Sequence, residues 1–291
     1  MEPLLDSSDW ELIRRLELSP RRRLAGQVTG EQRSPALGGG IEFADYREYV
    51  PGDDVRQVDW SVFLRFRKLM VKLSAEEKEL TLMTLVDTTR SMAWGQPSKF
   101  RQAQRIAAIL AGIALTSGNR AGVLSWGDRL VEAVEPLRGA RSVSALADRI
   151  GRLEATDEGR PLDGVRQFAT RYARRCLAVV VSDFLNADWL ATLQGLGASG
   201  AEVHVVHVLA PEELEPLHRG ELTLVDQENG SEAALLVDAA LLDRYRNEMQ
   251  GWLGEVASVC RSRGMGYTLV PSNASLPRLF LQDLVRSGLV C

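Results

Sequence analysis

The stretch "LMTLVDTTRSM", residues 82–92, joins an apolar run to a turn that is rich in hydroxyl groups, and the change falls at Asp87. An apolar run of this length bounded by a polar turn is typical of a buried strand. In α/β folds, ligands bind beyond the carboxyl ends of parallel strands. The stretch therefore predicts a strand that ends where such folds have their sites. Thr89 or Ser91 acting only as a helix or turn cap is the alternative.

A second stretch of the same kind is "LAVVVSDFL", residues 177–185, in which Asp183 follows an apolar run and one serine. Because the carboxyl ends of parallel strands lie at one edge of a sheet, we expect Asp183 near Asp87; a simple turn residue is the alternative. Carboxylate and hydroxyl oxygens are hard donors that suit Mg²⁺ or Mn²⁺. The candidate metal ligands are Asp87, Thr89, Ser91 and Asp183.

From residue 80 to the end of the chain, apolar runs alternate with amphipathic segments, which predicts an α/β domain with a mainly parallel sheet flanked by helices. Strands are expected at 80–86, 121–126, 130–134, 177–181, 202–209 and 267–270. Helices are expected at 98–116, 142–153, 162–174, 189–196 and 241–263, and from 276 onward. Residues 221–237 are predicted to form a hairpin insertion that turns at 228–230.

The first 79 residues are expected to pack on that domain as an N-terminal helix, residues 9–24, and additional β segments. The β part ends in an alternating stretch near residues 69–73. Its aromatic residues are expected in a core; they are Phe43, Tyr46, Tyr49 and Trp60. Its charged residues are expected to form an ion-pair network, with partner binding as the alternative; they are Arg47, Asp53, Arg56 and Asp59.

Composition excludes several classes of function. The chain has 291 residues and a net charge of -4, so it lacks the basic excess of nucleic-acid-binding proteins. Its 3 cysteines are far apart without any C-x-x-C pair, which argues against a disulfide framework or a zinc site and favours a reducing compartment. We find neither a secretory leader nor an apolar run long enough for a membrane span. We therefore expect a soluble cytoplasmic protein.

The loop Asp87-Thr88-Thr89-Arg90-Ser91 resembles the D-x-S-x-S loop of von Willebrand factor A domains, with threonine in place of the first serine. The metal-ion-dependent adhesion site of those domains adds a threonine and an aspartate from later loops. A longer run, "EFADYREYVPGDDVRQVDWSVFLRFRKLMVK", residues 42–72, resembles the signature of a bacterial and archaeal family called domain of unknown function 58. The resemblance covers residues 38–185 and implies a von Willebrand A-like, Rossmann-like fold.

One position departs from that pattern. Relatives carry the threonine ligand in a loop similar to G-G-T-D-L, whereas this chain has "EGRPL", residues 158–162, with Arg160 at the threonine position. A guanidinium group repels a cation or pairs with a carboxylate, so Arg160 would replace the charge of the metal rather than ligate it. Thr156 and Asp157 lie just upstream and would substitute if the loop is shifted. A bound Mg²⁺ or Mn²⁺ and a metal-free site that carries the charge of Arg160 are therefore the two alternatives.

The resemblance implies a non-enzymatic binding module that acts with a MoxR-type AAA+ ATPase on an unidentified client, in the assembly or remodelling of protein complexes. One alternative is a Mg²⁺-dependent hydrolase that uses the same carboxylates. The D-x-D-x-T pattern of dehalogenase-type phosphatases is not met, because Thr89 stands where the second aspartate belongs. The other alternative is a metal-free scaffold whose interface lies in residues 43–67.

Overall fold

The computed structural model describes residues 3–20, 43–51, 53, 55–74, 80–127, 129–155, 161–172, 176–216, 220–225 and 232–291. The chain forms two compact units: residues 1–23 join residues 79–291 in the larger one, and residues 24–78 form the smaller one. The division differs from the one expected at residue 79, because the N-terminal helix belongs to the larger unit. Packing of the β segment on the main domain stays a prediction.

The larger unit is built on a six-stranded sheet in the order β10-β7-β6-β3-β4-β5. Its strands are β3 (Thr81–Asp87), β4 (Arg120–Trp126), β5 (Leu130–Arg138), β6 (Cys176–Ser182), β7 (Glu202–Leu209) and β10 (Gly266–Pro271). Neighbouring strands are parallel except β4 and β5, which are antiparallel. The predicted mainly parallel sheet flanked by helices is confirmed.

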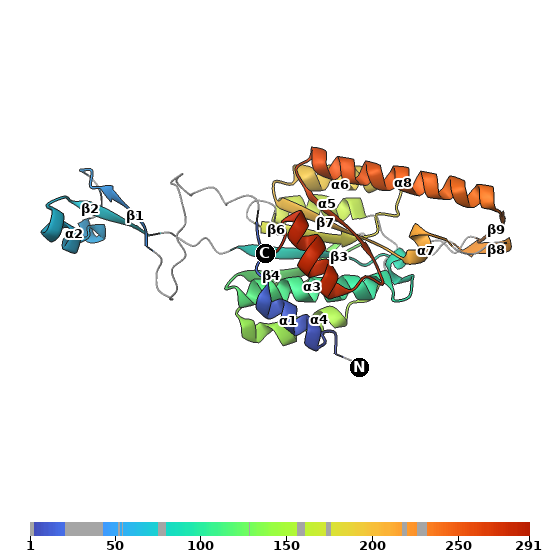
Figure 1. The fold of residues 1–291 in the computed structure, drawn as a ribbon, viewed down its shortest axis with the longest axis horizontal. Coiled ribbons are helices and arrows are strands. Elements are labelled where there is room, and N and C mark those ends of the chain that lie inside the picture. The colour runs from blue at the N-terminus through green and yellow to red at the C-terminus, as the bar shows by residue number, and fades with distance from the viewer. Residues whose placement is uncertain are drawn as a thin grey trace. The chain divides into compact units, whose positions relative to one another are not determined.

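Helices cover both faces of this sheet (Figure 1). One face carries α1 (Ser7–Arg15), α3 (Lys99–Thr116) and α4 (Val143–Gly151); the other carries α5 (Pro161–Arg171), α6 (Trp189–Ala198) and α8 (Ala239–Ser262). Successive side chains of a strand point to opposite faces, so each strand serves two cores. In β3, Leu82 and Val86 pack with α3, whereas Met83 and Leu85 pack in the core that includes residues of α5 and α6.

Helix α1 ends at Arg15, earlier than the expected position near residue 24. The next residues are extended because they pair with the C-terminus: the Glu17 amide donates to the Cys291 carbonyl at 3.0 Å, and the Cys291 amide donates to the Glu17 carbonyl at 2.9 Å. Pairing with a distant segment has overridden the helical periodicity. Residues 21–24 of the predicted helix lie outside the described residues.

The segment after β7 begins with the short helix α7 (Pro211–Leu214) and continues into β8 (Gly220–Val225) and β9 (Glu232–Val237), a separate antiparallel pair. The pair agrees with the predicted hairpin, whose expected turn at 228–230 lies outside the described residues. After β10, the final helical region consists of α9 (Leu276–Arg278), a π-helical turn (Leu279–Asp283) and α10 (Leu284–Ser287). Among the described residues, we find no helix with both the length and the apolar character to cross a membrane.

The smaller unit pairs β1 (Phe43–Glu48) with β2 (Met70–Ser74) and adds a 3-10 turn (Val55–Gln57) and α2 (Trp60–Phe66). Arg47 and Asp53 form a two-pronged ion pair at 2.5 and 2.8 Å, which lowers the pKa of Asp53 to about 2. Asp59 caps α2 and accepts a hydrogen bond from the Tyr46 hydroxyl. Trp60 is 57% exposed, so the expectation that it lies in a core was wrong.

Candidate functional site at the carboxyl edge of the sheet

Asp87 and Asp183 lie at the carboxyl ends of adjacent parallel strands, because β3 pairs directly with β6. Strand β3 leads through α3 to β4 on one side, while its neighbour on the other side, β6, comes much later in the chain. Such a reversal of strand order is where open α/β sheets bind their ligands. The two aspartates therefore flank the position that the fold reserves for a site.

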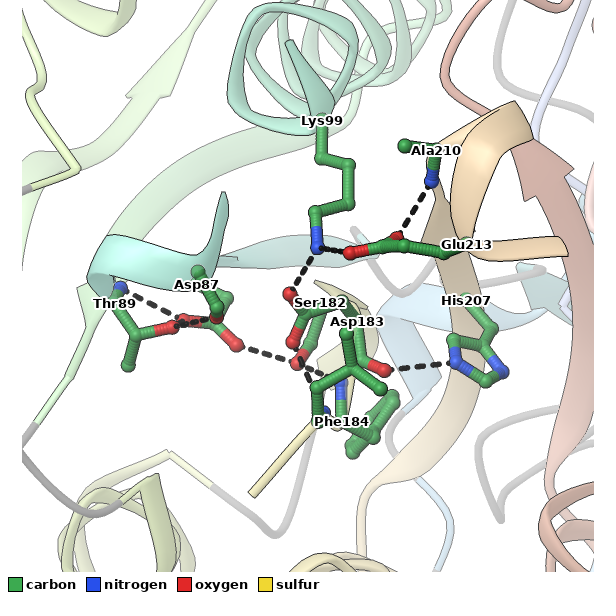
Figure 2. A network of polar contacts seen from close by, with 11 residues as sticks. Asp87, Thr89, Lys99, Ser182, Asp183, Phe184, His207, Ala210 and Glu213 are labelled. Atoms are coloured by element: carbon green, nitrogen blue, oxygen red, sulfur yellow. Dashed lines mark hydrogen bonds and ion pairs between the residues drawn. The ribbon is translucent and has the colours of Figure 1, made fainter. Parts of the chain in front are cut away.

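The Asp87 carboxylate is completely buried and held by three protein donors (Figure 2). Its Oδ1 accepts hydrogen bonds from the amide and the hydroxyl of Thr89, at 2.9 and 2.6 Å, and its Oδ2 accepts one from the Ser182 hydroxyl at 2.5 Å. The Ser91 hydroxyl lies 3.1 Å from that of Thr89. Burial and the nearby charge of Asp183 raise the pKa of Asp87 to about 7, although these hydrogen bonds oppose the rise.

A buried ammonium group stands beside this carboxylate cluster. Lys99, the first residue of α3, has a fully buried side chain, and its Nζ donates to Asp183 Oδ2 at 2.7 Å and to Glu213 Oε1 at 2.6 Å. Burial alone would lower the pKa of Lys99, but the two carboxylates outweigh it and raise that pKa. A cation at a helix N-terminus opposes the helix dipole, so these carboxylates also hold Lys99 in a position that its own helix disfavours.

Two further residues complete the surroundings of Lys99 and Asp183. Glu213 belongs to α7, and its Oε2 accepts a hydrogen bond from the Ala210 amide at 2.7 Å; burial raises its pKa against the effect of Lys99. His207 of β7 donates from Nε2 to the Asp183 carbonyl at 2.9 Å and accepts at Nδ1 from the Tyr267 hydroxyl at 3.0 Å. Burial lowers the pKa of His207 to about 4, so the imidazole is neutral at pH 7.

Six residues form what we call the sheet-edge network: Asp87, Thr89, Lys99, Ser182, Asp183 and Glu213. We asked whether its carboxylate oxygens can ligate a divalent ion. Asp183 Oδ1 accepts from the Leu185 amide at 3.1 Å and its Oδ2 accepts from Lys99, so all four oxygens of Asp87 and Asp183 already have protein donors. The described residues contain no cluster of three histidine, cysteine, aspartate or glutamate side chains suited to a metal. As arranged, they do not fit a site in which Asp183 ligates Mg²⁺ or Mn²⁺, because an ammonium already supplies the positive charge.

Comparison with known proteins places the chain in a family. The profile of the family described as "Protein of unknown function DUF58" matches residues 45–251. The chain belongs to this family. The matched region includes most of the N-terminal signature, both strand-ending aspartates and most of the sheet.

Proteins similar to this DUF58 chain include two from mycobacteria that are described as uncharacterized. The chain is 29% identical to an uncharacterized protein of Mycobacterium bovis over 94% of its own length and 87% of that protein, and equally to one of Mycobacterium tuberculosis. Among solved structures, it resembles the conserved hypothetical protein BatB from Bacteroides thetaiotaomicron, with 13% identity, a TM-score of 0.45, and coverage of 72% of this chain and 98% of that one. An aerotolerance-related membrane protein from Bacteroides fragilis gives 15% identity and a TM-score of 0.37, with coverage of 64% and 98%.

The structure of this DUF58 chain brings together the side chains of Asp87, Thr89 and Ser91, with Asp183 at the end of the neighbouring strand. Whether they bind a metal stays a prediction. The three loop residues that were to modify the site, Thr156, Asp157 and Arg160, lie outside the described residues. The larger unit holds Asp87 and Asp183, whereas the smaller unit holds the four charged residues expected to form an ion-pair network: Arg47, Asp53, Arg56 and Asp59.

Sequence reasoning missed four residues: Lys99, Ser182, His207 and Glu213. One signal was available for Lys99, because a lysine in the first turn of a predicted helix is disfavoured by the helix dipole and needs a partner. Glu213 gave no such signal, since an acidic residue after a proline in a polar segment is usually solvated. His207 gave no signal either, because nothing in the sequence of its apolar strand links it to Asp183.

Proposed function

We propose that this chain is a non-enzymatic, von Willebrand A-like binding module that acts in the cytoplasm with a MoxR-type AAA+ ATPase on an unidentified client, in the assembly or remodelling of protein complexes. The ATPase partner rests on the family resemblance of the sequence. The observation that carries the binding role is the sheet-edge network at the reversal of strand order. It combines carboxylates and hydroxyls of the kind that the resemblance implies for an adhesion site with a buried cation, Lys99, which contacts Asp183 and Glu213.

Exposed apolar side chains beside the network support a protein partner. Trp94 follows the Asp87 turn and is 39% exposed; Leu185 follows Asp183 and is 40% exposed. Both lie in segments that leave the carboxyl ends of β3 and β6. A buried polar centre next to partly exposed aromatic and aliphatic side chains has the composition of a protein-binding surface, in which tryptophan is a frequent energetic anchor.

The burial of the acid–base groups argues against a hydrolase. Asp87 has no exposed surface and three hydrogen bonds, so it is shielded from attack on a substrate. His207 is fully buried with both ring nitrogens engaged, which leaves it unsuited to proton transfer at neutral pH. A general acid or base must reach the proton that it transfers. A phosphatase and esterase screen of the wild type and Asp87→Ala tests this alternative; turnover that is lost in Asp87→Ala would establish an enzyme.

Co-purification with a candidate MoxR-type ATPase tests the proposed partnership. We expect the wild type to retain the ATPase and the double variant Trp94→Ala/Leu185→Ala to retain at least tenfold less, because both side chains are cut back without disturbing a core. Leu236→Ala is the matched control, since Leu236 of β9 is 69% exposed and lies in the separate hairpin. No retention by the wild type would contradict the partner, and equal retention by both variants would contradict the surface.

A further inference from the structure

Lys99 lies between two carboxylates that differ in their attachment to the fold (Figure 2). Asp183 follows a core strand and its side chain is 2% exposed, whereas Glu213 comes from the short helix α7 and its side chain is 15% exposed. Lys99 itself has no exposed side-chain surface. Glu213 is therefore the outermost of the three groups, and it separates the ammonium from solvent.

The charges of the three groups are not balanced. One ammonium neutralises one carboxylate, and Asp183 suffices for that at a distance of 2.7 Å. Glu213 adds a second negative charge to a largely dry site, and burial works against its ionised form. The contact between Lys99 and Glu213 is thus less favourable to the fold than the contact between Lys99 and Asp183.

Helix α7 is also weakly anchored. It has only four residues and none of them is buried. Apart from the Lys99 contact, Glu213 is held by the amide and carbonyl of Ala210 in its own segment and by the Tyr245 hydroxyl of α8, which donates to the Glu213 carbonyl at 2.6 Å. Segments with little buried surface open at a low free-energy cost compared with global unfolding. Release of Glu213 therefore requires no change in the sheet or in α3.

We propose that Lys99 is a carboxylate receptor and that Glu213 is its built-in, displaceable occupant, which gives way to an acidic side chain of a partner protein. This inference rests on the proposed binding function and names the chemistry that the partner must present. Exchange of one carboxylate for another leaves the charge and hydrogen bonds of Lys99 unchanged. The free energy that drives the exchange then comes from the other contacts between the partner and this chain. Binding also releases α7 and breaks the hydrogen bond between Tyr245 and the Glu213 carbonyl.

Chemical rescue with acetate tests the receptor without any partner. Glu213→Ala removes the occupant's carboxylate and leaves a gap beside Lys99. We expect 100 mM sodium acetate to raise the thermal midpoint of Glu213→Ala by several degrees relative to equal concentrations of sodium chloride or acetamide. Wild type and Glu215→Ala should show no such rise, because Glu213 occupies the receptor in both. Glu213→Gln, which keeps the side-chain volume, is the second variant and should respond less than Glu213→Ala.

Loss of the receptor must abolish the rescue. The double variant Lys99→Met/Glu213→Ala is expected to show the same midpoint in acetate and in chloride, and an acetate-specific rise in it would overturn the assignment to Lys99. The absence of any acetate-specific rise in a folded Glu213→Ala would overturn the receptor itself. If Glu213→Ala does not fold, the same comparison in Glu213→Gln decides the question, because acetate can displace a neutral amide from an ammonium.

Displacement by a partner is tested by co-purification with the MoxR-type ATPase. Emptying the receptor should increase retention of the ATPase by at least threefold in Glu213→Ala, whereas Lys99→Met should reduce it by a similar factor. Unchanged retention in both variants would overturn displacement while leaving the partnership intact. If the wild type retains no ATPase, the proposed partner fails, and the acetate rescue still decides separately whether Lys99 receives carboxylates.

Discussion

Removal of the Lys99 ammonium is the perturbation with the largest expected effect on this fold. Lys99→Met keeps most of the side-chain volume but leaves the Asp183 carboxylate, 2% exposed, without its cation. Breaking a buried ion pair by removing one partner costs about 3–5 kcal/mol.

The assay is thermal and urea-induced unfolding of wild type and variant at pH 7, followed by circular dichroism. For a unit of this size, each kcal/mol moves the thermal midpoint by roughly 2–4 °C, so we expect a decrease of about 10 °C. The double variant Lys99→Met/Asp183→Asn should recover part of the loss, because it removes the more deeply buried of the two carboxylates that lose Lys99 as their partner. Arg244→Met is the control, since the ion pair of Arg244 with Glu248 is exposed on α8 and should leave the midpoint unchanged. A loss below about 1 kcal/mol in Lys99→Met, or no recovery in the double variant, would refute the buried ion pair as the centre of the site.

Three other predictions follow from the same structure. Calorimetric titration of the wild type with Mg²⁺ or Mn²⁺ should give no binding heat, while a signal that disappears in Asp87→Ala would restore the metal site. Because Asp87 has a pKa raised to about 7 from an ordinary value of 3.8, its contribution to stability is fully present below about pH 4 and lost as the pH rises through 7. The free energy of unfolding of the wild type, measured with urea, should therefore fall between pH 4 and pH 8, with up to about 4 kcal/mol of the fall due to Asp87. Asp87→Asn should show a fall that is smaller by that amount, and an unchanged pH profile would contradict the buried carboxyl. A Cβ atom added at Gly112 of α3 would lie 2.6 Å from the Ile13 side chain of α1, so Gly112→Leu should destabilise the larger unit by about 1–3 kcal/mol. Gly254→Leu, at an open position of α8, is the control and should not destabilise it. Equal thermal midpoints of the two variants would argue against the packing of α1 on α3.

Much of the sheet was predictable because its signals are local. The apolar runs that end at Asp87 and Asp183 have the length and flanking residues of buried strands, and parallel strands bring their carboxyl ends to one edge. The positions of both aspartates in the fold followed from those two facts. The end of α1 could not be predicted in this way, because it depends on the pairing of Glu17 with Cys291, which no local sequence pattern indicates.

The sequence by itself determined the α/β sheet, the two aspartates at its edge and the hydroxyl-rich turn that holds Asp87. Only the tertiary structure decided what faces Asp183. Lys99 is 84 residues from Asp183 and 114 residues from Glu213, and although its place at a helix start indicates that it needs a partner, its own segment does not indicate which one. Burial of an ammonium is favourable only where carboxylates meet it, and that meeting depends on how α3 and α7 are placed over the ends of β6 and β7. The identity of the cation at this edge is therefore a property of the fold and not of any single motif.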